Sequence, residues 1–247
     1  ISQEQFFIGE GEEVGRLWQV PLNSNWEGLP DTLIEERLVI PNYSQLAVQN
    51  EGALRLNTEN TAHYISNYKG ELLEALLNDL ESLDATSQLQ VVEERRLLAE
   101  GGKVSYAELV PLIERLSKAN SYMVISAISS VLNGLDKFID ENSEEEAAKH
   151  DLIRRIFHDK FERLGFLPSP GESDEDEMVR QLVLAQLIEA HDLDVTAEAS
   201  QLFAQYRDDL EKIPASIRAV LLINEFKSSE TVELLNEYIG YYVKTND

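Results

Sequence analysis

Histidine is the residue type in this chain best suited to hold a metal ion or to act as a general base near neutral pH. The four histidines are His63, His150, His158 and His191. No two of them form an H-x-x-x-H pair, and the H-E-x-x-H motif of zinc peptidases is absent. His150 and His158 would lie two turns apart on neighbouring faces of a helix, too far apart to share one ion. We therefore predict no metal ligand and no catalytic residue in this chain.

A calcium loop is the next candidate, because oxygen-bearing side chains alternate along Asp192–Thr196 as they do at the start of an EF-hand. The sixth position of such a loop needs glycine and is Ala197 here, and the twelfth needs a bidentate acid and is Phe203. We expect no calcium ion there. Asp194 or Thr196 is instead predicted to cap the N-terminus of a helix.

No other motif supplies a reaction centre. The sequence has no G-x-S-x-G elbow, no P-loop and no G-x-G-x-x-G that opens a helix after a strand. Without cysteine it has no thiolate nucleophile, disulfide or sulfur-ligated metal, which suits a reducing, cytoplasmic location. The substrate-binding residues stay unknown, because acidic side chains are too numerous for any pair to stand out.

The net charge limits the classes of binding partner that we expect. The chain carries 46 acidic and 21 basic side chains among 247 residues, a net charge of −25. Such a field repels phosphate backbones and anionic lipid headgroups, so we expect neither nucleic acid nor a membrane as partner. Hydrophobic residues make up 43% of the chain, which is enough for a soluble, folded protein with a sizeable core.

Residues 1–57 are predicted to form a small partial β-sandwich. Short apolar or alternating runs occur there between glycine, proline and asparagine residues. The four predicted strands span residues 6–8, 16–22, 33–40 and 53–56. So few strands leave sheet edges unpaired, and we expect the segment to be part of a larger β-domain or a lid packed on helices.

Residues 58–247 are predicted to form a helical array domain, because apolar residues recur there with a helical period. Ser105, followed three residues later by Glu108, predicts a capping box. The predicted helices span about 72–83, 86–100, 105–117, 121–140, 143–163, 174–191, 196–211, 215–226 and 229–243. The connections are mostly short, so consecutive helices should pack antiparallel. The predicted fold class is therefore mainly α, a curved array of antiparallel helix pairs (a HEAT-like α-α superhelix) preceded by the small β unit.

Two further features concern surfaces. Tyr238, Tyr241 and Tyr242 lie at helical spacing, so they form either a core face or a surface for a helix missing from this chain. Residues 165–171 contain two prolines and precede five acidic side chains at 172–177. We expect a solvated loop followed by the acidic first turn of a helix.

Short motifs of the first 68 residues follow the order of a known family. Ser2–Phe7 resembles that family's S-Q-x-R-F strand, and Leu17–Leu22 resembles its W-x-(I/V)-P-(L/I) strand. Leu56-Asn57 and His63–Tyr68 resemble the stretch that enters its helical domain. Two family arginines are replaced, by Gln5 and by the residue at position 65, which puts particular polar contacts in doubt but not the fold.

The later motifs complete the series. They are Glu93–Gly102, Leu164–Phe166, Leu202-Phe203 and Ile213–Arg218. By their joint order and spacing, the chain resembles the C-terminal part of the aminopeptidase N family of zinc metallopeptidases, most closely the lactic-acid-bacterial type.

The resemblance implies a division of labour within a longer parent enzyme. The parent would hold its zinc ion, its H-E-x-x-H motif and its G-A-M-E-N motif in an earlier catalytic domain, and this chain alone should be inactive. The helical domain would cup over the catalytic cleft as a wall that limits access to peptides. The implied partners are the catalytic domain of the same polypeptide and the parent's peptide substrates.

An alternative is a free-standing helical-repeat scaffold that binds protein partners through a concave face. The chain begins with Ile1 and not with methionine, which favours a piece of something longer. A start codon and a stop codon bracketing these residues would favour the scaffold.

Overall fold

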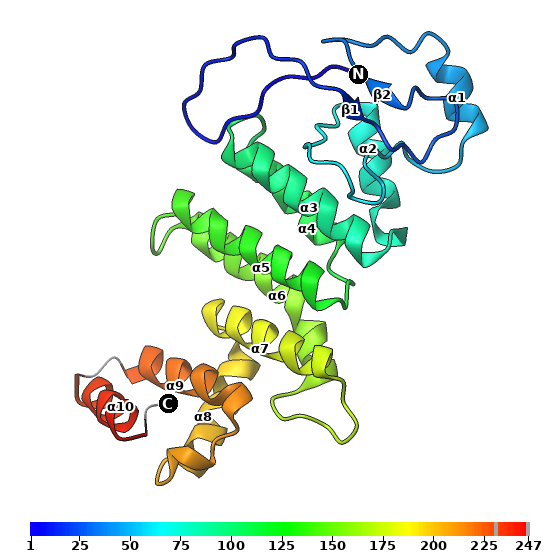
Figure 1. The fold of residues 1–247 in the computed structure, drawn as a ribbon. Helices are drawn as coiled ribbons and strands as arrows, with labels where there is room; N and C mark the ends of the chain where they lie inside the picture. The colour runs from blue at the N-terminus through cyan, green and yellow to red at the C-terminus, as the bar shows by residue number, and fades with distance from the viewer. Residues whose placement is uncertain (230–231, 246–247) are drawn as a thin grey trace. The chain divides into compact units, whose positions relative to one another are not determined.

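The computed structural model describes residues 1–229 and 232–245, and over these ranges the fold is mainly α, as predicted (Figure 1). Helices α1 to α10 make up most of the described secondary structure, beside one two-stranded sheet. The chain divides into two compact units, Ile1–Leu135 and Asp136–Asp247. The predicted domain boundary after residue 57 falls inside the first unit and stays a prediction.

The N-terminal segment, residues 1–57, is less regular than its sequence pattern predicts. Strand β1 (Val20–Pro21) pairs antiparallel with β2 (Thr32–Leu33), and each lies in or at the edge of a predicted strand. The predicted strands at 6–8 and 53–56 do not form. Helix α1 (Tyr43–Gln49), which the pattern did not predict, follows β2.

Side chains take the place of the missing strands. The carboxamide of Asn25 donates to the carbonyl of Ala53 at 3.0 Å and accepts from the backbone N–H of Arg55 at 2.7 Å, so it occupies backbone groups that a neighbouring strand would use. The Phe6 ring packs against helix α3 so closely that a Cβ on Gly101 would lie 2.5 Å from it. The period-2 pattern of these runs therefore reflects contacts with side chains and with a helix, not a sheet.

The segment has a small apolar core of its own. Trp26, Leu46 and Leu54 are buried together, and the Trp26 ring stacks on Tyr43 with 5.8 Å between centroids. The indole N–H of Trp26 donates to the carbonyl of Gly52 at 3.2 Å. One tryptophan thus holds α1 and the chain after it together.

The helices of the first unit follow the predicted order. They are α2 (Glu71–Asp79), α3 (Ala85–Glu100), α4 (Leu109–Arg115) and α5 (Tyr122–Leu135), with 3-10 turns η1 (Leu80–Ser82) and η2 (Tyr106–Glu108). The predicted capping box is confirmed at η2. The Ser105 side chain accepts a backbone N–H of the turn, and the Glu108 side chain accepts the backbone N–H of Ser105. Helix α3 packs against both α4 and α5. Its N-terminus is capped by Asp84, whose side chain accepts from the N–H of Ser87 at 3.0 Å.

The second unit contains the longest helix of the described chain. Its elements are η3 (Asp136–Phe138), α6 (Glu144–Leu164), α7 (Asp174–Glu189), α8 (Leu193–Tyr206), η4 (Leu210–Lys212), α9 (Ala215–Ser229) and α10 (Val232–Thr245). Helix α6 packs on α7, and α9 packs on both α7 and α8. Consecutive helices are therefore neighbours, as the short connections predict. Two residues of the predicted helix at 229–243, at positions 230 and 231, lie outside the described residues.

Two details of this unit differ from expectation. Helix α8 begins three residues earlier than predicted and is capped by Asp192, whose side chain accepts from the N–H groups of Asp194 and Val195; the predicted caps, Asp194 and Thr196, lie inside the helix. Four of the five acidic residues after the proline loop, those at 174–177, form the first turn of α7 as expected. The loop itself is fastened, because the fully buried Arg180 pairs with Glu172.

Candidate functional site

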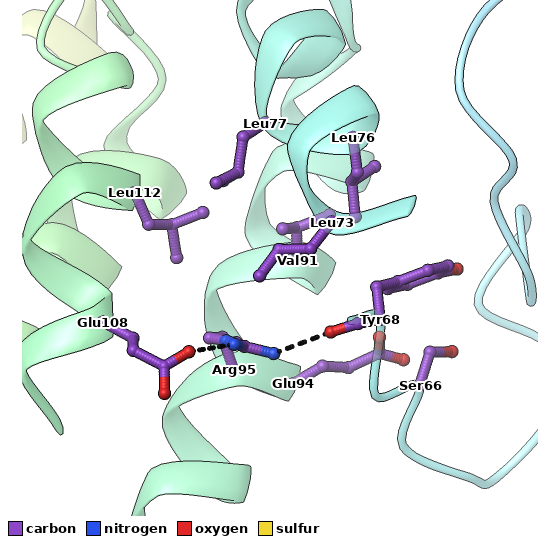
Figure 2. A pocket seen from close by; sticks show the side chains of 10 residues that line it. All are labelled: Ser66, Tyr68, Leu73, Leu76, Leu77, Val91, Glu94, Arg95, Glu108 and Leu112. Carbon is purple, nitrogen blue, oxygen red and sulfur yellow. Dashed lines mark hydrogen bonds and ion pairs between the residues drawn. The ribbon is translucent and has the colours of Figure 1, made fainter. Parts of the chain in front are cut away.

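A small cavity in the first unit lies where helices α2, α3 and α4 meet the connecting segment, residues 62–69 (Figure 2). Its volume is about 20 Å³. One end is apolar and the other polar in Figure 2. The lining residues are Leu73, Leu76 and Leu77 of α2, Val91, Glu94 and Arg95 of α3, Glu108 of η2, Leu112 of α4, and Ser66 and Tyr68 of the connecting segment.

Arg95 joins three elements at the polar end. Its guanidinium donates to the carboxamide of Asn67 at 3.3 Å and to the carbonyl of Tyr68 at 3.2 Å, and it pairs with Glu108. The same carboxylate accepts from the backbone N–H of Ser105 at 3.1 Å in the capping box. That backbone hydrogen bond, together with the ion pair, lowers the pKa of Glu108. Glu108 therefore stays ionised and neutralises the guanidinium.

Glu94, the neighbour of Arg95 in sequence, lies in a different environment. The residue is 9% exposed, and its carboxylate accepts from the side-chain amide of Gln90 at 3.1 Å. Burial raises the pKa of Glu94 to about 7, and the weaker contacts with Gln90 and Ser66 oppose that rise only in part. Glu94 is therefore poised to gain or lose a proton near neutral pH.

Two tyrosines of the connecting segment reach back to the N-terminal segment. The Tyr68 hydroxyl accepts from the backbone N–H of Leu56 at 2.7 Å, and the Tyr64 hydroxyl donates to the carbonyl of Leu22 at 2.8 Å. Burial raises the pKa of Tyr68 to about 12 and raises that of Tyr64 as well, with the charge of Glu94 adding to both rises. Both hydroxyls therefore remain neutral across the physiological range and keep these hydrogen bonds.

The geometry of this site suits structural joining and not substrate chemistry. A cavity of about 20 Å³ has room for about one water molecule and none for a peptide. The polar groups around it connect α3, η2 and the connecting segment.

Sequence reasoning missed Glu94 and Arg95, although their positions carry a signal. They fall at helical spacing with the apolar Val91 and Leu98, on a face of α3 that is turned inward.

The histidines lie apart from one another in the structure, except for His150 and His191, whose separation in the sequence gives no sign that they are close. The rings of His150 and His191 approach edge to face with 5.5 Å between centroids, because the chain returns to α6 after α7. The pKa of His150 is lowered, chiefly by burial. His158 lies 3.1 Å from the carboxylate of Asp192. Across residues 1–229 and 232–245, no group of three or more His, Cys, Asp or Glu side chains is arranged to hold a metal ion.

The tyrosines of α10 are divided between two faces. The hydroxyls of Tyr238 and Tyr241 are buried, whereas Tyr242 is 59% exposed. Tyr242 shares an exposed apolar face with Val232, Leu235, Ile239 and Val243. Tyr238 and Tyr241 thus lie partly toward the core, and a surface for a further helix stays a prediction for the exposed face.

The N-terminal segment also exposes large apolar side chains. They are Ile8, Val14, Leu17, Trp18, Ile34, Val39 and Val48. A contiguous apolar patch on a folded protein marks a contact surface, whereas apolar side chains exposed singly are common. Among the described helices, none is long and apolar enough to cross a membrane.

Comparison with known proteins gives a consistent result along the chain. A family model for the ERAP1-like C-terminal domain matches residues 54–247. Aminopeptidase N of Lactococcus lactis subsp. lactis is 54% identical over 248 residues, which cover 100% of this chain and 29% of that protein. Aminopeptidase N of Lactobacillus delbrueckii subsp. lactis is 37% identical over 247 residues, with the same 100% and 29% coverage. Puromycin-sensitive aminopeptidase of Caenorhabditis elegans is 25% identical over 226 residues, 88% of this chain and 24% of that protein.

Proposed function

Because the chain belongs to the family of ERAP1-like C-terminal domains, we propose that it is the non-catalytic C-terminal region of a zinc-dependent aminopeptidase. The parent enzyme would remove N-terminal residues from peptides. One observation carries this proposal: 54% identity along the whole chain to a protein named aminopeptidase N, of which the chain spans 29%. The remaining length of such a relative leaves room for a separate catalytic domain.

In the proposed enzyme, this chain forms the helical wall that encloses the active-site chamber and limits the access of peptides. Zinc belongs to the catalytic domain, whose residues would supply the ligands and the general base. In the described part of this chain, no group of three or more His, Cys, Asp or Glu side chains is arranged to hold a metal ion. The peptide substrates and the catalytic domain are thus its proposed partners.

The apolar residues exposed on the N-terminal segment support a contact with another part of the same polypeptide. Leu17 and Trp18 are 53% and 45% exposed, next to the short strand β1. Burying such side chains against a neighbouring domain removes a large apolar area from water. We propose a cytoplasmic location for the enzyme, since the chain contains no cysteine and so no disulfide.

A domain exchange tests the proposal. The region of the Lactococcus lactis aminopeptidase N that matches this chain is replaced by this chain, and kcat/KM is measured for an aminoacyl anilide and for peptides of increasing length. We expect the chimera to keep the anilide activity within about tenfold of the parent, and to show the peptide-length preference of an enclosed chamber. The matched control is the same enzyme truncated before this region, which should lose stability and length preference.

Two results would contradict the proposal. One is zinc-dependent cleavage by the isolated chain, because the chain would then have its own reaction centre. The other is a folded chimera whose length preference equals that of the truncated control, because the chain would then not form a wall. High-affinity capture of a defined protein partner by the isolated chain would favour the scaffold alternative instead.

A further inference from the structure

The turn between α7 and α8 is held on α6 by one face of that helix. The contacts come from side chains four residues apart, which lie one above another on a helix. They are His150 on the ring of His191, Arg154 on the carbonyl of Ala190, and His158 on the carboxylate of Asp192. Three consecutive residues of the turn are therefore bound by side chains that carry, or can gain, a positive charge.

His191 occupies a backbone position that favours glycine. Its φ is 51°, its N–H donates to the carbonyl of Ile188 at 3.2 Å, and the N–H of Asp192 donates to the carbonyl of Leu187 at 2.9 Å. These two hydrogen bonds form a Schellman motif, whose left-handed residue is usually glycine. A left-handed conformation strains a residue that carries a Cβ, so a histidine there indicates a contact that offsets the strain. That contact is the edge-to-face approach to His150, with 5.5 Å between ring centroids.

Charged groups of several elements lie around the two rings. On α6 they are Glu146, Lys149, Asp151 and Arg154; on α7, Glu189; on α9, Lys227, through its ion pair with Glu189; and in the turn, Asp192, which binds His158. Glu146 accepts from the N–H of Asn142 at 2.7 Å, and Glu189 is paired with Lys227, so neither carboxylate is reserved for an imidazolium. Burial outweighs their attraction and lowers the pKa of His150.

Protonation changes the contact between the rings from attractive to repulsive. Two neutral imidazoles pack edge to face, as aromatic rings prefer. Two imidazolium ions at the same distance repel each other, and the charge of Lys149 also opposes protonation of His150. His158 responds in the opposite sense, because a protonated imidazole binds the Asp192 carboxylate more strongly.

We propose that His150 and His191 form an acid-sensitive joint, which holds the turn between α7 and α8 on α6 while both imidazoles are neutral and releases it when both are protonated. Because the pKa of His150 is lowered from 6.5, the folded state binds this proton less tightly than the unfolded state does. The stabilisation is fully present above pH 6.5 and is lost as the pH falls through the lowered pKa. The joint does not depend on the proposed enzymatic role of the chain.

Two measurements on the wild-type chain test the joint. Nuclear Overhauser contacts between the rings of His150 and His191 should be present at about pH 7.5 and absent at about pH 5. Amide protection at residues 191 and 192, corrected for the intrinsic pH dependence of exchange, should be about tenfold lower at the acidic pH, as expected for two like charges at this distance. Unchanged protection, or rings still in contact at pH 5, would overturn the proposal. Higher protection at pH 5 would also overturn it, because the pair of His158 and Asp192 would then dominate.

His191→Gly separates the imidazole from the backbone conformation. Glycine adopts the left-handed conformation without strain, so the turn should stay folded at pH 7.5 and its loss of protection on acidification should disappear. His150→Gln removes the other imidazole, leaves the turn unaltered in sequence, and should abolish the acid response as well. The matched control is His63→Gln, whose exposed side chain lies in the first unit and whose removal should leave the response intact. An acid response that persists in both His191→Gly and His150→Gln would assign it to the carboxylates and refute the joint.

Discussion

The N-terminal segment and the helices of the second unit satisfy their backbone polar groups in different ways. In the segment, single carboxamide side chains do so: Gln3 binds both backbone groups of Trp18, and Asn57 binds both backbone groups of Ala62. In the helices, the backbone is paired along the chain and side chains are needed only at the ends. Individual polar side chains therefore pair backbone groups of the segment beside its small apolar core, whereas the helices pair their own backbone and rely on apolar burial.

The two regions also differ in what they leave exposed. Apolar side chains of the segment such as Ile8 and Val39 are 62% and 67% exposed, whereas Phe157 of α6 and Leu187 of α7 are completely buried. A region with few buried contacts and open sheet edges opens more readily than a packed helical core. We therefore expect amide hydrogen exchange to be fastest in residues 1–57. Slower exchange there than in α6 and α7 would refute the comparison.

The largest effect should follow from removing an apolar side chain of the helical core. Phe157→Ala deletes a ring that is 0% exposed, and such a deletion costs about 3–5 kcal/mol. Urea unfolding followed by circular dichroism should show the loss. The control is Phe138→Ala in the same unit, where the side chain is 66% exposed and the expected change is within about 0.5 kcal/mol. Equal losses in the two variants would contradict a core that depends on α6.

The next largest effect is a pH dependence of the unfolding free energy, which comes from Glu94 where α3 contacts the connecting segment. The pKa of Glu94 is raised by burial from 4.5 to about 7, so the folded state holds this proton more tightly than the unfolded state. The corresponding stability is fully present below pH 4.5 and is lost as the pH rises through 7. The shift corresponds to roughly 3 kcal/mol. Unfolding free energies measured from pH 4.5 to 8.5 should fall by about that amount from this group.

Glu94→Gln isolates that contribution. The amide cannot ionise, so the difference between wild type and variant should grow with pH and level off above the pKa of Glu94. Neighbouring groups are common to both curves: Glu108, whose pKa is lowered, titrates below this window, and Tyr64 and Tyr68, whose pKa values are raised, titrate above it. Parallel curves would mean that Glu94 is hydrated and ionises normally.

The sequence predicts the helices well because their signals are local. The apolar period and the capping box of Ser105 and Glu108 depend on neighbours within one turn, and the structure places both as expected. The predicted start of α8 is three residues too late, and this error also has a local cause. Asp192 and Asp194 are both residue types that cap helices, and in the structure the cap is Asp192, whose backbone is extended with φ −62° and ψ 124°.

The cavity and the N-terminal segment are poorly predicted because their contacts are not local. Glu94 and Ser66 are distant in sequence and meet only once the connecting segment lies on α3. Asn25 replaces a strand partner for residues about thirty positions later, which no periodicity shows. The approach of His150 to His191 likewise requires two helices to pack first. Sequence reasoning therefore located the helices after residue 57, but not the elements of the N-terminal segment or the long-range polar contacts.

A smaller effect should follow from removing a polar anchor of the segment. Asn57 is buried, has a positive φ of 54°, donates to the carbonyl of Ala62 at 2.7 Å and accepts from its N–H at 2.8 Å. Asn57→Ala loses both hydrogen bonds and places alanine in a left-handed conformation, at a cost of about 2 kcal/mol. Hydrogen exchange should accelerate around residues 56–66 with little change in α6. Asn142→Ala is the control, because exposed Asn142 has a similar φ of 60°, so the substitution adds the left-handed strain alone and should cost about 1 kcal/mol.

The smallest effect, and the sharpest test of how the segment is held, concerns Gln3. Its carboxamide donates to the carbonyls of Trp18, Ile34 and Glu35 at 3.0, 3.3 and 3.1 Å and accepts from the N–H of Trp18 at 2.9 Å. Gln3→Ala should cost about 1 kcal/mol, because these groups are exposed enough for water to replace the side chain. The amide of Trp18 should then exchange faster.

Gln3→Glu separates donation from acceptance at the same position. A carboxylate can still accept from the Trp18 amide, but it cannot donate to the three carbonyl oxygens and faces them with a negative charge. We therefore expect Gln3→Glu to destabilise the segment at least as much as Gln3→Ala at pH 7, and less at a pH where the new carboxyl is protonated and can donate. If Gln3→Glu behaved like the wild type at pH 7, the donated hydrogen bonds would contribute nothing, and packing alone would hold this part of the segment.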